Sequence, residues 1–353
     1  MIKVLIVEDS PVVREFLIYI LSSDPEIEVA GTARNGAEAV DTVARINPDV
    51  VTMDIHMPKV DGFEATRKIM ESNPRPIVIV SGSSTREEVS MTFRALEAGA
   101  LAIVPRPKGL GHPEHEESAR ELIRTVKLMS EVKVVRRWPR SRVGGAVPPT
   151  PRLATNKAQA EARVVAIGAS TGGPLVLQTI LSGLHKDFPA PLLIVQHMAP
   201  GFAEGFVEWL AQSTNFPVHI AGQGELMLPG HAYVAPDGFQ MGVRSAGRIV
   251  LSEDEPENGL RPSVSYLFRS VAQVYGQHAV GVLLTGMGKD GAAEMKVLKE
   301  RDAVTIVQDK ESCIVFGMPG EAMKLDAATY VFPPEKLAEA LRSLVVKKRE
   351  TQL

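Results

Sequence analysis

The chain has 353 residues, of which 44% are hydrophobic and 23% charged, so it can form an ordinary globular core, and its length favours two domains. Its net charge of −3 neither favours nor excludes any class of partner. The single cysteine, Cys313, excludes an internal disulfide framework and fits a reducing cytoplasm. No run approaches the roughly 20 apolar residues of a membrane span, and the N-terminal apolar run, which ends at Glu8, is too short for a signal peptide. We therefore expect a cytoplasmic protein without membrane insertion.

Residues 1–128 alternate short apolar runs with amphipathic segments, which predicts a parallel sheet covered by helices on both faces. Helix-like patterns lie between the runs, for example at 12–21 and 87–98. We expect a domain of five βα units. The predicted strands are Lys3–Val7, Glu28–Ala33, Val50–Met53, Ile77–Val80 and Ala102–Val104.

Residues 129–162 interrupt this pattern with several prolines, a Gly-Gly pair and many basic side chains. We interpret the segment as a solvated linker between domains. A nucleic-acid patch would carry interleaved aromatic residues, and only Trp138 is present, so we expect no nucleic-acid partner.

From residue 163 to about 346 the βα alternation returns, interrupted by an antiparallel interlude with two Gly-containing turns. We expect a three-layer α/β/α, Rossmann-like domain with an antiparallel β-hairpin insertion, and helices over 291–300 and from Pro334. The predicted strands are Val164–Ile167, Leu192–Val195, Ala279–Leu284 and Ala303–Val307, with Ala232–Ala235, Gln240–Val243 and Ile249–Leu251 forming the interlude.

Acidic side chains follow two strands of the first domain. Glu8 and Asp9 close the first strand and Asp54 closes the third, while Ser81 ends the fourth and Arg106 follows the fifth. Because the carboxyl ends of parallel strands meet at one edge of a sheet, these groups should converge. Hard oxygen ligands suit Mg²⁺, and bound Mg²⁺ would allow Asp54 to attack a phosphoryl donor. We therefore predict a metal site of Glu8, Asp9 and Asp54.

This segment resembles the receiver domain of two-component response regulators over its full length. Asp54 lies in a Met-Asp-Ile-His-Met-Pro pattern and is followed by Asp61-Gly62, which matches the phosphoacceptor motif. The resemblance implies a flavodoxin-like fold, with Asp54 as the phosphorylation site and Glu8 and Asp9 as the acidic pair.

The same resemblance makes Ser81 the switch hydroxyl and Arg106 the switch cation. The family usually has lysine where Arg106 stands, and arginine replaces a compact ammonium with a planar fork. Lys108 is an alternative partner for the phosphoryl group. Ile103 occupies the place of the family's switch aromatic residue.

In the second domain, Ser170 lies in a Gly-Ala-Ser-Thr-Gly-Gly-Pro sequence between a predicted strand and a helix. This satisfies G-x-S-x-G, a sharp turn that exposes a serine hydroxyl beside helix N-terminal amides. A nucleotide-phosphate cradle is the alternative. It is disfavoured because the G-x-G-x-x-G spacing is absent and the next strand runs into Gln196-His197, where a ribose-binding acid is expected.

A serine nucleophile needs a base and a group that orients the base. His197 and Asp290 both follow predicted strand ends, so they should share the sheet edge with Ser170. An alternative for Asp290, which precedes Gly291, is that it only caps the following helix.

The segment from 163 to about 345 resembles the catalytic domain of the chemotaxis-specific protein-glutamate methylesterases, the CheB family. The resemblance implies that Ser170, His197 and Asp290 form the triad and that the amides of Thr171 and Met287 donate to the oxyanion. It rests on four stretches, at 168–173, 196–198, 261–264 and 284–291. One departure is Ser265, where an acid is expected after Arg-Pro-Ser-Val.

The resemblance further implies hydrolysis of glutamate methyl esters on chemoreceptors, with release of methanol, and deamidation of receptor glutamines. A chemotaxis histidine kinase is the implied phosphodonor, and the esterase itself needs no cofactor. The alternative function is that of a response regulator whose output domain binds a partner without catalysis.

Overall fold

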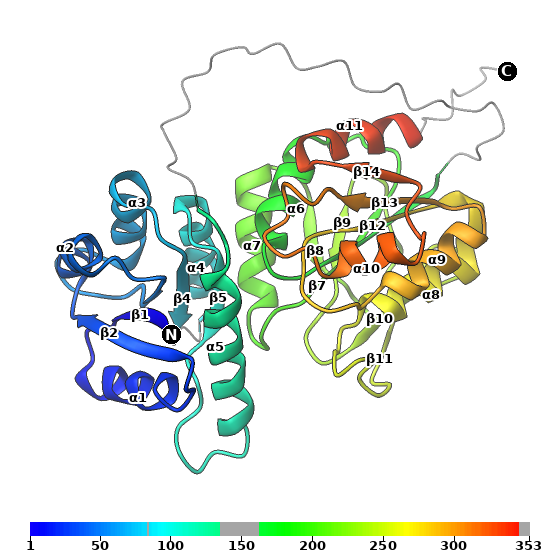
Figure 1. The fold of residues 1–353 in the computed structure, drawn as a ribbon. Coiled ribbons are helices and arrows are strands. Elements are labelled where there is room, and N and C mark those ends of the chain that lie inside the picture. The colour runs from blue at the N-terminus through cyan, green and yellow to red at the C-terminus, as the bar shows by residue number, and fades with distance from the viewer. Residues whose placement is uncertain (83–84, 135–161, 346–353) are drawn as a thin grey trace, which may run out of the picture. The chain divides into compact units, whose positions relative to one another are not determined.

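The computed structural model describes residues 1–82, 85–134 and 162–345. The chain divides into two compact units, Met1–Ala146 and Val147–Leu353, which we treat separately (Figure 1). Most of the expected linker at 129–162 lies outside the described residues. Among the described helices, none is long and apolar enough to cross a bilayer.

The first unit holds a five-stranded parallel sheet in the order β2-β1-β3-β4-β5, which confirms the expected flavodoxin-like fold. Helices α1 and α5 contact each other, as do α2 and α3, and α3 and α4. The strands are β1 (Ile2–Val7), β2 (Ile27–Ala33), β3 (Val50–Met53), β4 (Ile77–Ser81) and β5 (Ala102–Pro105). The helices are α1 (Pro11–Leu21), α2 (Gly36–Ile46), α3 (Gly62–Ser72), α4 (Arg86–Ala98) and α5 (His115–Ser130).

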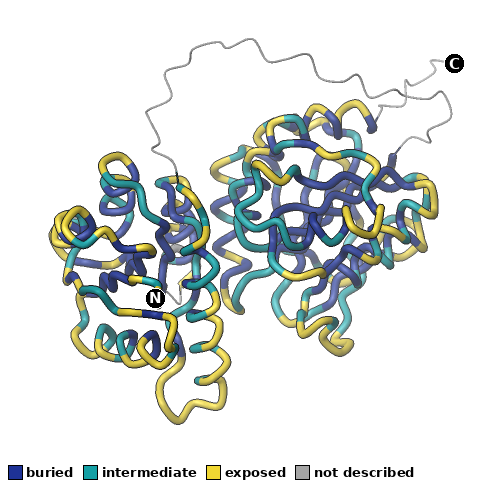
Figure 2. The backbone as a smooth tube through the Cα atoms, viewed as in Figure 1, coloured by how far each residue is buried: buried dark blue, intermediate teal, exposed yellow. Residues whose placement is uncertain are grey.

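Local chemistry explains where several of these helices begin. The side chains of Ser10, Asn35, Asp61 and Thr85 each accept a hydrogen bond from a backbone N–H in the first turn of the next helix. Strands β3 and β4 are buried along their whole length, as expected for a parallel sheet covered on both faces (Figure 2).

The second unit holds a seven-stranded sheet in the order β14-β13-β12-β6-β7-β9-β8, with every neighbouring pair parallel, and a separate antiparallel hairpin of β10 and β11. The sheet strands are β6 (Val164–Ala169), β7 (Leu192–Gln196), β8 (Val218–Ile220), β9 (Ala232–Val234), β12 (Ala279–Leu283), β13 (Val304–Gln308) and β14 (Tyr330–Phe332). The hairpin strands are β10 (Gln240–Arg244) and β11 (Arg248–Ser252). The helices are α6 (Gly173–Ser182), α7 (Ala203–Thr214), α8 (Val264–Tyr275), α9 (Ala292–Glu300), α10 (Met318–Lys324) and α11 (Pro334–Leu344), with a 3₁₀ turn at Gly276–His278.

Helices cover both faces of this sheet (Figure 1). Helix α6 packs against α7 and α11, and α9 packs against α8 and α10. One core cluster joins alternate residues of β6, such as Val164 and Ala166, to Val264 and Leu267 of α8. Their neighbours Val165 and Ile167 are also fully buried, so both faces of β6 are covered. The expected three-layer α/β/α domain is confirmed.

One expectation about the hairpin region is wrong. Residues 232–235 were predicted to join the antiparallel interlude, but β9 pairs in parallel with β7 and β8 in the main sheet. The turn at 236–238 carries the chain from one sheet into another. Local alternation of apolar residues shows that a strand forms, but it does not show which strand will be its neighbour.

Candidate active site and acidic cluster

The three residues predicted for the esterase site follow three adjacent strands of the larger sheet. Ser170 follows the central strand β6, His197 follows β7, and Asp290 lies in the loop after β12, which pairs with β6 on its other side. The strand register sets Ala169 opposite Gln196, so Ser170 and His197 are the next residues on neighbouring strands. From β6 the chain continues to β7 on one side, and from β12 it continues to β13 on the other, so the strand order reverses between β6 and β12. Open α/β sheets place their sites at such a reversal.

Ser170 lies in a tight turn between β6 and α6 and is partly exposed. Its N–H donates to the Thr285 carbonyl (3.0 Å), and its carbonyl accepts from Gly173 N–H (2.8 Å). Gly172 has φ +82°, and a Cβ there would lie 2.6 Å from Ile314 Cγ1. The turn therefore requires glycine at this position.

Gln196 is a buried polar residue that the sequence analysis did not assign a role. Its side-chain amide donates to the carbonyl oxygens of Ser170 (2.9 Å) and His197 (2.8 Å). One side chain thus holds the backbones of the nucleophile and base candidates together. The sequence signal for this role is a glutamine that directly follows the apolar run Leu-Leu-Ile-Val, where a buried strand ends.

The His197 ring contacts the Asp290 carboxylate, with 2.9 Å between Nε2 and Oδ2. This contact leaves Nδ1 as the ring nitrogen available to Ser170. Within the described part of the chain, no hydrogen bond joins the Ser170 hydroxyl to the ring. Catalytic hydrogen bonds are often long without substrate and shorten when it binds.

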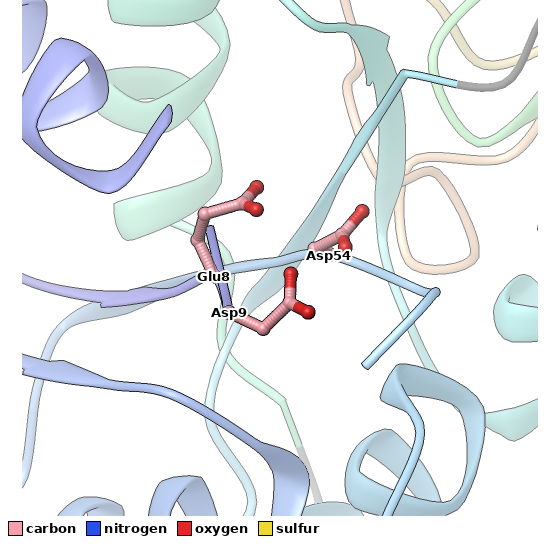
Figure 3. Close-up of side chains that lie close together, drawn as sticks. All are labelled: Glu8, Asp9 and Asp54. Carbon is pink, nitrogen blue, oxygen red and sulfur yellow. The ribbon is translucent and has the colours of Figure 1, made fainter. Parts of the chain in front are cut away.

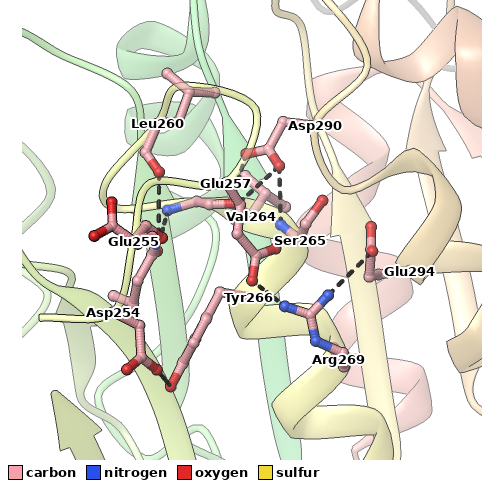
Figure 4. A network of polar contacts seen from close by, with 12 residues as sticks. Asp254, Glu255, Glu257, Leu260, Val264, Ser265, Tyr266, Arg269, Asp290 and Glu294 are labelled. Carbon is pink, nitrogen blue, oxygen red and sulfur yellow. Dashed lines mark hydrogen bonds and ion pairs between the residues drawn. The ribbon is translucent and has the colours of Figure 1, made fainter. Parts of the chain in front are cut away.

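The Asp290 carboxylate is buried and accepts three further hydrogen bonds from the start of α8. The donors are Ser263 Oγ (2.8 Å), Val264 N–H (2.6 Å) and Ser265 N–H (3.1 Å), as Figure 4 shows in part. Burial alone would raise the pKa of Asp290, but hydrogen bonds from His197 and the two serines, with the nearby imidazole charge, lower it to about 2.

Asp290 therefore caps a helix, but not the helix that follows it. Helix α9 begins after Gly291 with no side-chain cap bond, so the alternative role of Asp290 as the α9 cap is wrong. The carboxylate instead caps α8, which begins 26 residues earlier in the chain.

Within the described segments, some backbone N–H groups near Ser170 already donate a hydrogen bond to a carbonyl, and others do not. The N–H groups of Ser170 and Gly286 donate to the carbonyls of Thr285 and Val315, both at 3.0 Å. Among the described residues, no acceptor is bound to the N–H of Thr171 or Met287. These last two are the amides that the sequence analysis predicted as oxyanion donors.

In the first unit, Glu8, Asp9 and Asp54 each offer a carboxylate oxygen, and the three oxygens lie within 4.8 Å of one another (Figure 3). Burial and the neighbouring Asp54 raise the pKa of Glu8 to about 7, and burial likewise raises the pKa of Asp54. Three hard oxygen donors gathered this closely, two of them on buried side chains, fit Mg²⁺.

Arg106 supplies part of the compensating charge. Its Nη2 atom lies 3.2 Å from Glu8 Oε2 and 3.7 Å from Asp54 Oδ1. In the described residues, Lys108 makes no ion pair with these acids. Ser81 is buried at the end of β4, with its hydroxyl 3.4 Å from that of Thr92.

Comparisons with known proteins match both units. Residues 165–341 match the family described as CheB methylesterase, and residues 4–112 match the response regulator receiver domain. A protein-glutamate methylesterase/protein-glutamine glutaminase of Nitrosospira multiformis is 62% identical, over 100% of this chain and 99% of its own. The relative of that name numbered 4 from Geobacter metallireducens is 60% identical, over 99% of this chain and 100% of its own. The crystal structure of the Thermotoga maritima CheB methylesterase catalytic domain is similar, with a TM-score of 0.51 and 38% identity, over 53% of this chain and 100% of that domain.

Proposed function

The chain belongs to the CheB methylesterase family, and on that premise we propose that it hydrolyses glutamate methyl esters on chemoreceptors under the control of its receiver domain. The same site would deamidate receptor glutamines, in keeping with the names of its relatives. The observation that carries this proposal is the His197–Asp290 pair, at 2.9 Å, beside a serine turn on the neighbouring strand.

In the proposed reaction, Ser170 Oγ attacks the ester carbonyl while His197 Nδ1 takes its proton. Asp290 binds the Nε2 side of the ring, which holds the correct tautomer and stabilises the imidazolium that forms. The imidazolium then gives its proton to the departing methoxide, so that methanol leaves and an acyl-enzyme remains. Water clears the acyl group by the same proton transfers in reverse.

The oxyanion of the tetrahedral intermediate would rest on the N–H groups of Thr171 and Met287. The neighbouring amides of Ser170 and Gly286 already donate to carbonyls, so this pair supplies the donors that remain. One such donor typically contributes about 10²–10³-fold to the rate. Methoxide is a modest leaving group, which makes this contribution necessary.

Control would come from phosphorylation of Asp54 by a chemotaxis histidine kinase. Glu8, Asp9 and Asp54 would hold Mg²⁺, which when bound neutralises charge on the phosphoryl group. Arg106 already bridges Glu8 and Asp54 and would turn toward the phosphoryl oxygens, with Ser81 as the second switch group.

The proposal places the reaction in the cytoplasm, where receptor helices and the kinase would meet the enzyme. The single cysteine fits this reducing compartment.

The test is methanol release from methylated receptor membranes, with and without a small phosphodonor. Ser170→Ala should abolish release while the thermal unfolding midpoint stays unchanged, because the serine lies at a partly exposed turn. Ser343→Ala, which removes a hydroxyl bonded only to its own helix, is the matched control. A fluorophosphonate that labels wild type but not Ser170→Ala would exclude a non-catalytic binding module. Equal turnover by wild type and Ser170→Ala would overturn the proposal.

A further inference from the structure

The first turn of α8 is built around the carboxylate of another loop. Ser263 is the N-cap residue of α8, yet its hydroxyl makes no cap bond to its own helix and donates to Asp290 Oδ1 instead (2.8 Å). Two of the N–H groups that have no partner within the helix, on Val264 and Ser265, donate to the same carboxylate. Asp290 therefore sits at the positive end of a 12-residue helix.

Ser265 binds the Asp290 loop through both its backbone and its side chain. Its N–H donates to Asp290 Oδ1 (3.1 Å), and its hydroxyl accepts from the N–H of Gly291 (2.9 Å), the residue after Asp290. Ser265 is buried. One residue thus holds both the carboxylate of Asp290 and the backbone immediately behind it.

Close packing keeps the two segments in register. The side chain of Val264 is fully buried between β6 and the Asp290 loop. A Cβ on Gly168 or Gly291 would lie within 2.3 and 2.4 Å of Val264 Cγ1, respectively. The two glycines permit this approach, which brings the helix end within hydrogen-bonding distance of Asp290.

The hairpin supports the same helix end through a buried glutamine. Gln240 of β10 accepts from Ser263 N–H (2.8 Å) and donates to the carbonyls of Glu255 (3.3 Å) and Leu260 (3.1 Å). Figure 4 shows the bond to Leu260 beside the α8 start. The loop that leads into Ser263 is therefore tied to the hairpin.

We propose that Ser265 and Ser263, braced by Gln240, are positioning residues for the reaction, because they set the place of the carboxylate that orients His197. This inference rests on the proposed function. Each acts through Asp290: Ser263 and Ser265 donate to its carboxylate, and Gln240 binds the N–H of Ser263. Among the described residues, Asp290 is the one charged group that contacts the His197 ring.

The other charged groups near this helix end have partners elsewhere or are exposed. Arg269 of α8 pairs with Glu257 of the preceding loop and Glu294 of α9 (Figure 4). Lys289 is exposed. Arg261, two residues before Ser263, donates to the carbonyls of Glu253 and Asp254. An acid at 265 would therefore add a new negative charge beside Asp290.

The experiment measures kcat, KM, the pH–rate profile and thermal unfolding of the full chain on methylated receptor membranes. Ser265→Ala should lower kcat about tenfold with KM unchanged, because a buried N–H loses its acceptor and the Asp290 loop shifts. Ser263→Ala should do the same by removing a donor to the carboxylate. Thr305→Val is the matched control. It also removes a buried hydroxyl, one that donates to the Ala327 carbonyl (2.7 Å), at the start of β13 and away from the site. The N–H of Thr329, which this hydroxyl also accepts, keeps the Thr305 carbonyl (2.9 Å) as an acceptor.

Ser265→Asp separates positioning from mere structural support. It restores an acceptor for Gly291 but places a second carboxylate beside Asp290. The acid limb of the pH–rate profile should then move to higher pH by about one unit, because the added charge favours the protonated imidazole. Ser265→Ala should leave that limb in place.

Unchanged kcat in Ser265→Ala, or an equal loss in Thr305→Val, would overturn the inference. If Ser265→Ala does not fold, Ser263→Ala decides by the same criterion. Ser170→Ala in the same assay distinguishes a failure of the proposed function from a failure of the positioning role. Activity that does not depend on Ser170 refutes the proposed function, whereas Ser170-dependent activity that is indifferent to Ser263 and Ser265 refutes only the positioning role.

Discussion

Asp290→Asn removes one charge and one acceptor from a carboxylate that accepts four hydrogen bonds. The amide can lie in two orientations. With its oxygen at the Oδ2 position, it keeps His197 Nε2 and Val264 N–H as donors, and its nitrogen then meets Ser265 N–H, 3.1 Å from Oδ1 in the wild type. The Ser263 hydroxyl can rotate to accept from it.

The reverse orientation costs more. The amide nitrogen would then face Val264 N–H, which lies 2.6 Å from Oδ2, so two donors would meet at closer range. His197 would have to accept at Nε2 and carry its proton on Nδ1, and it could not act as base toward Ser170. We therefore expect the first orientation to prevail, with the correct tautomer kept and the charge lost.

The expected loss follows from these bonds. One buried N–H without an acceptor costs about 1–3 kcal/mol of stability, but it is orphaned before and during the reaction alike, so it does not lower kcat. The loss in kcat comes from the bond to His197, whose charge stabilises the imidazolium that forms in the transition state. A charged hydrogen bond is worth about 1.5–3 kcal/mol, which corresponds to about 10- to 150-fold in kcat. The rate of methanol release from methylated receptor membranes measures this loss in kcat. A loss below about tenfold would refute the assignment of Asp290 as the orienting group and require another acid in that role.

Asp290→Asn also tests the lowered pKa of Asp290 through the pH dependence of the free energy of unfolding. The pKa of Asp290 is about 2 in the folded chain against an ordinary 3.8, so its ionised form stabilises the fold at pH values above 3.8. That contribution is lost as the pH falls through about 2. The difference corresponds to about 2 kcal/mol. Urea unfolding, followed by the buried Trp209, should show a gap between wild type and Asp290→Asn that shrinks from pH 5 toward pH 2. A gap that does not depend on pH would contradict the lowered pKa.

Three further predictions follow from the acidic cluster, the two-unit division and the lone thiol. Asp54→Asn should keep the basal rate of methanol release and lose its stimulation by a small phosphodonor, whereas stimulation that survives would place the phosphorylation site elsewhere. A fragment that starts near residue 161 should be more active than the unphosphorylated full chain, and equal rates would exclude simple blocking of the site by the receiver domain. Burial raises the pKa of Cys313 to about 12, so at pH 8 a thiol reagent should label the folded chain at least about 100-fold more slowly than the urea-unfolded chain, and comparable rates would contradict this.

The sequence by itself determined which residues stand at the strand ends. Short apolar runs, punctuated by glycine turns, placed Ser170, His197 and Asp54 just past strands, and parallel strands bring their carboxyl ends to one edge. The nature of these side chains then indicated the chemistry, since a serine beside helix amides and a set of converging carboxylates each suit few reactions. That reasoning needs only local patterns and one topological rule.

Only the tertiary structure decided what holds those residues in place. The capping of α8 by Asp290 joins segments 25 to 27 residues apart, and the bond from Gln240 to Ser263 spans 23. The assignment of β9 to the main sheet also depended on its neighbours, β7 and β8. Such contacts depend on how closely two elements pack, which at this site is set by Val264 against two glycines. Periodicity and turn signals describe each segment alone, so they carry no information about that distance.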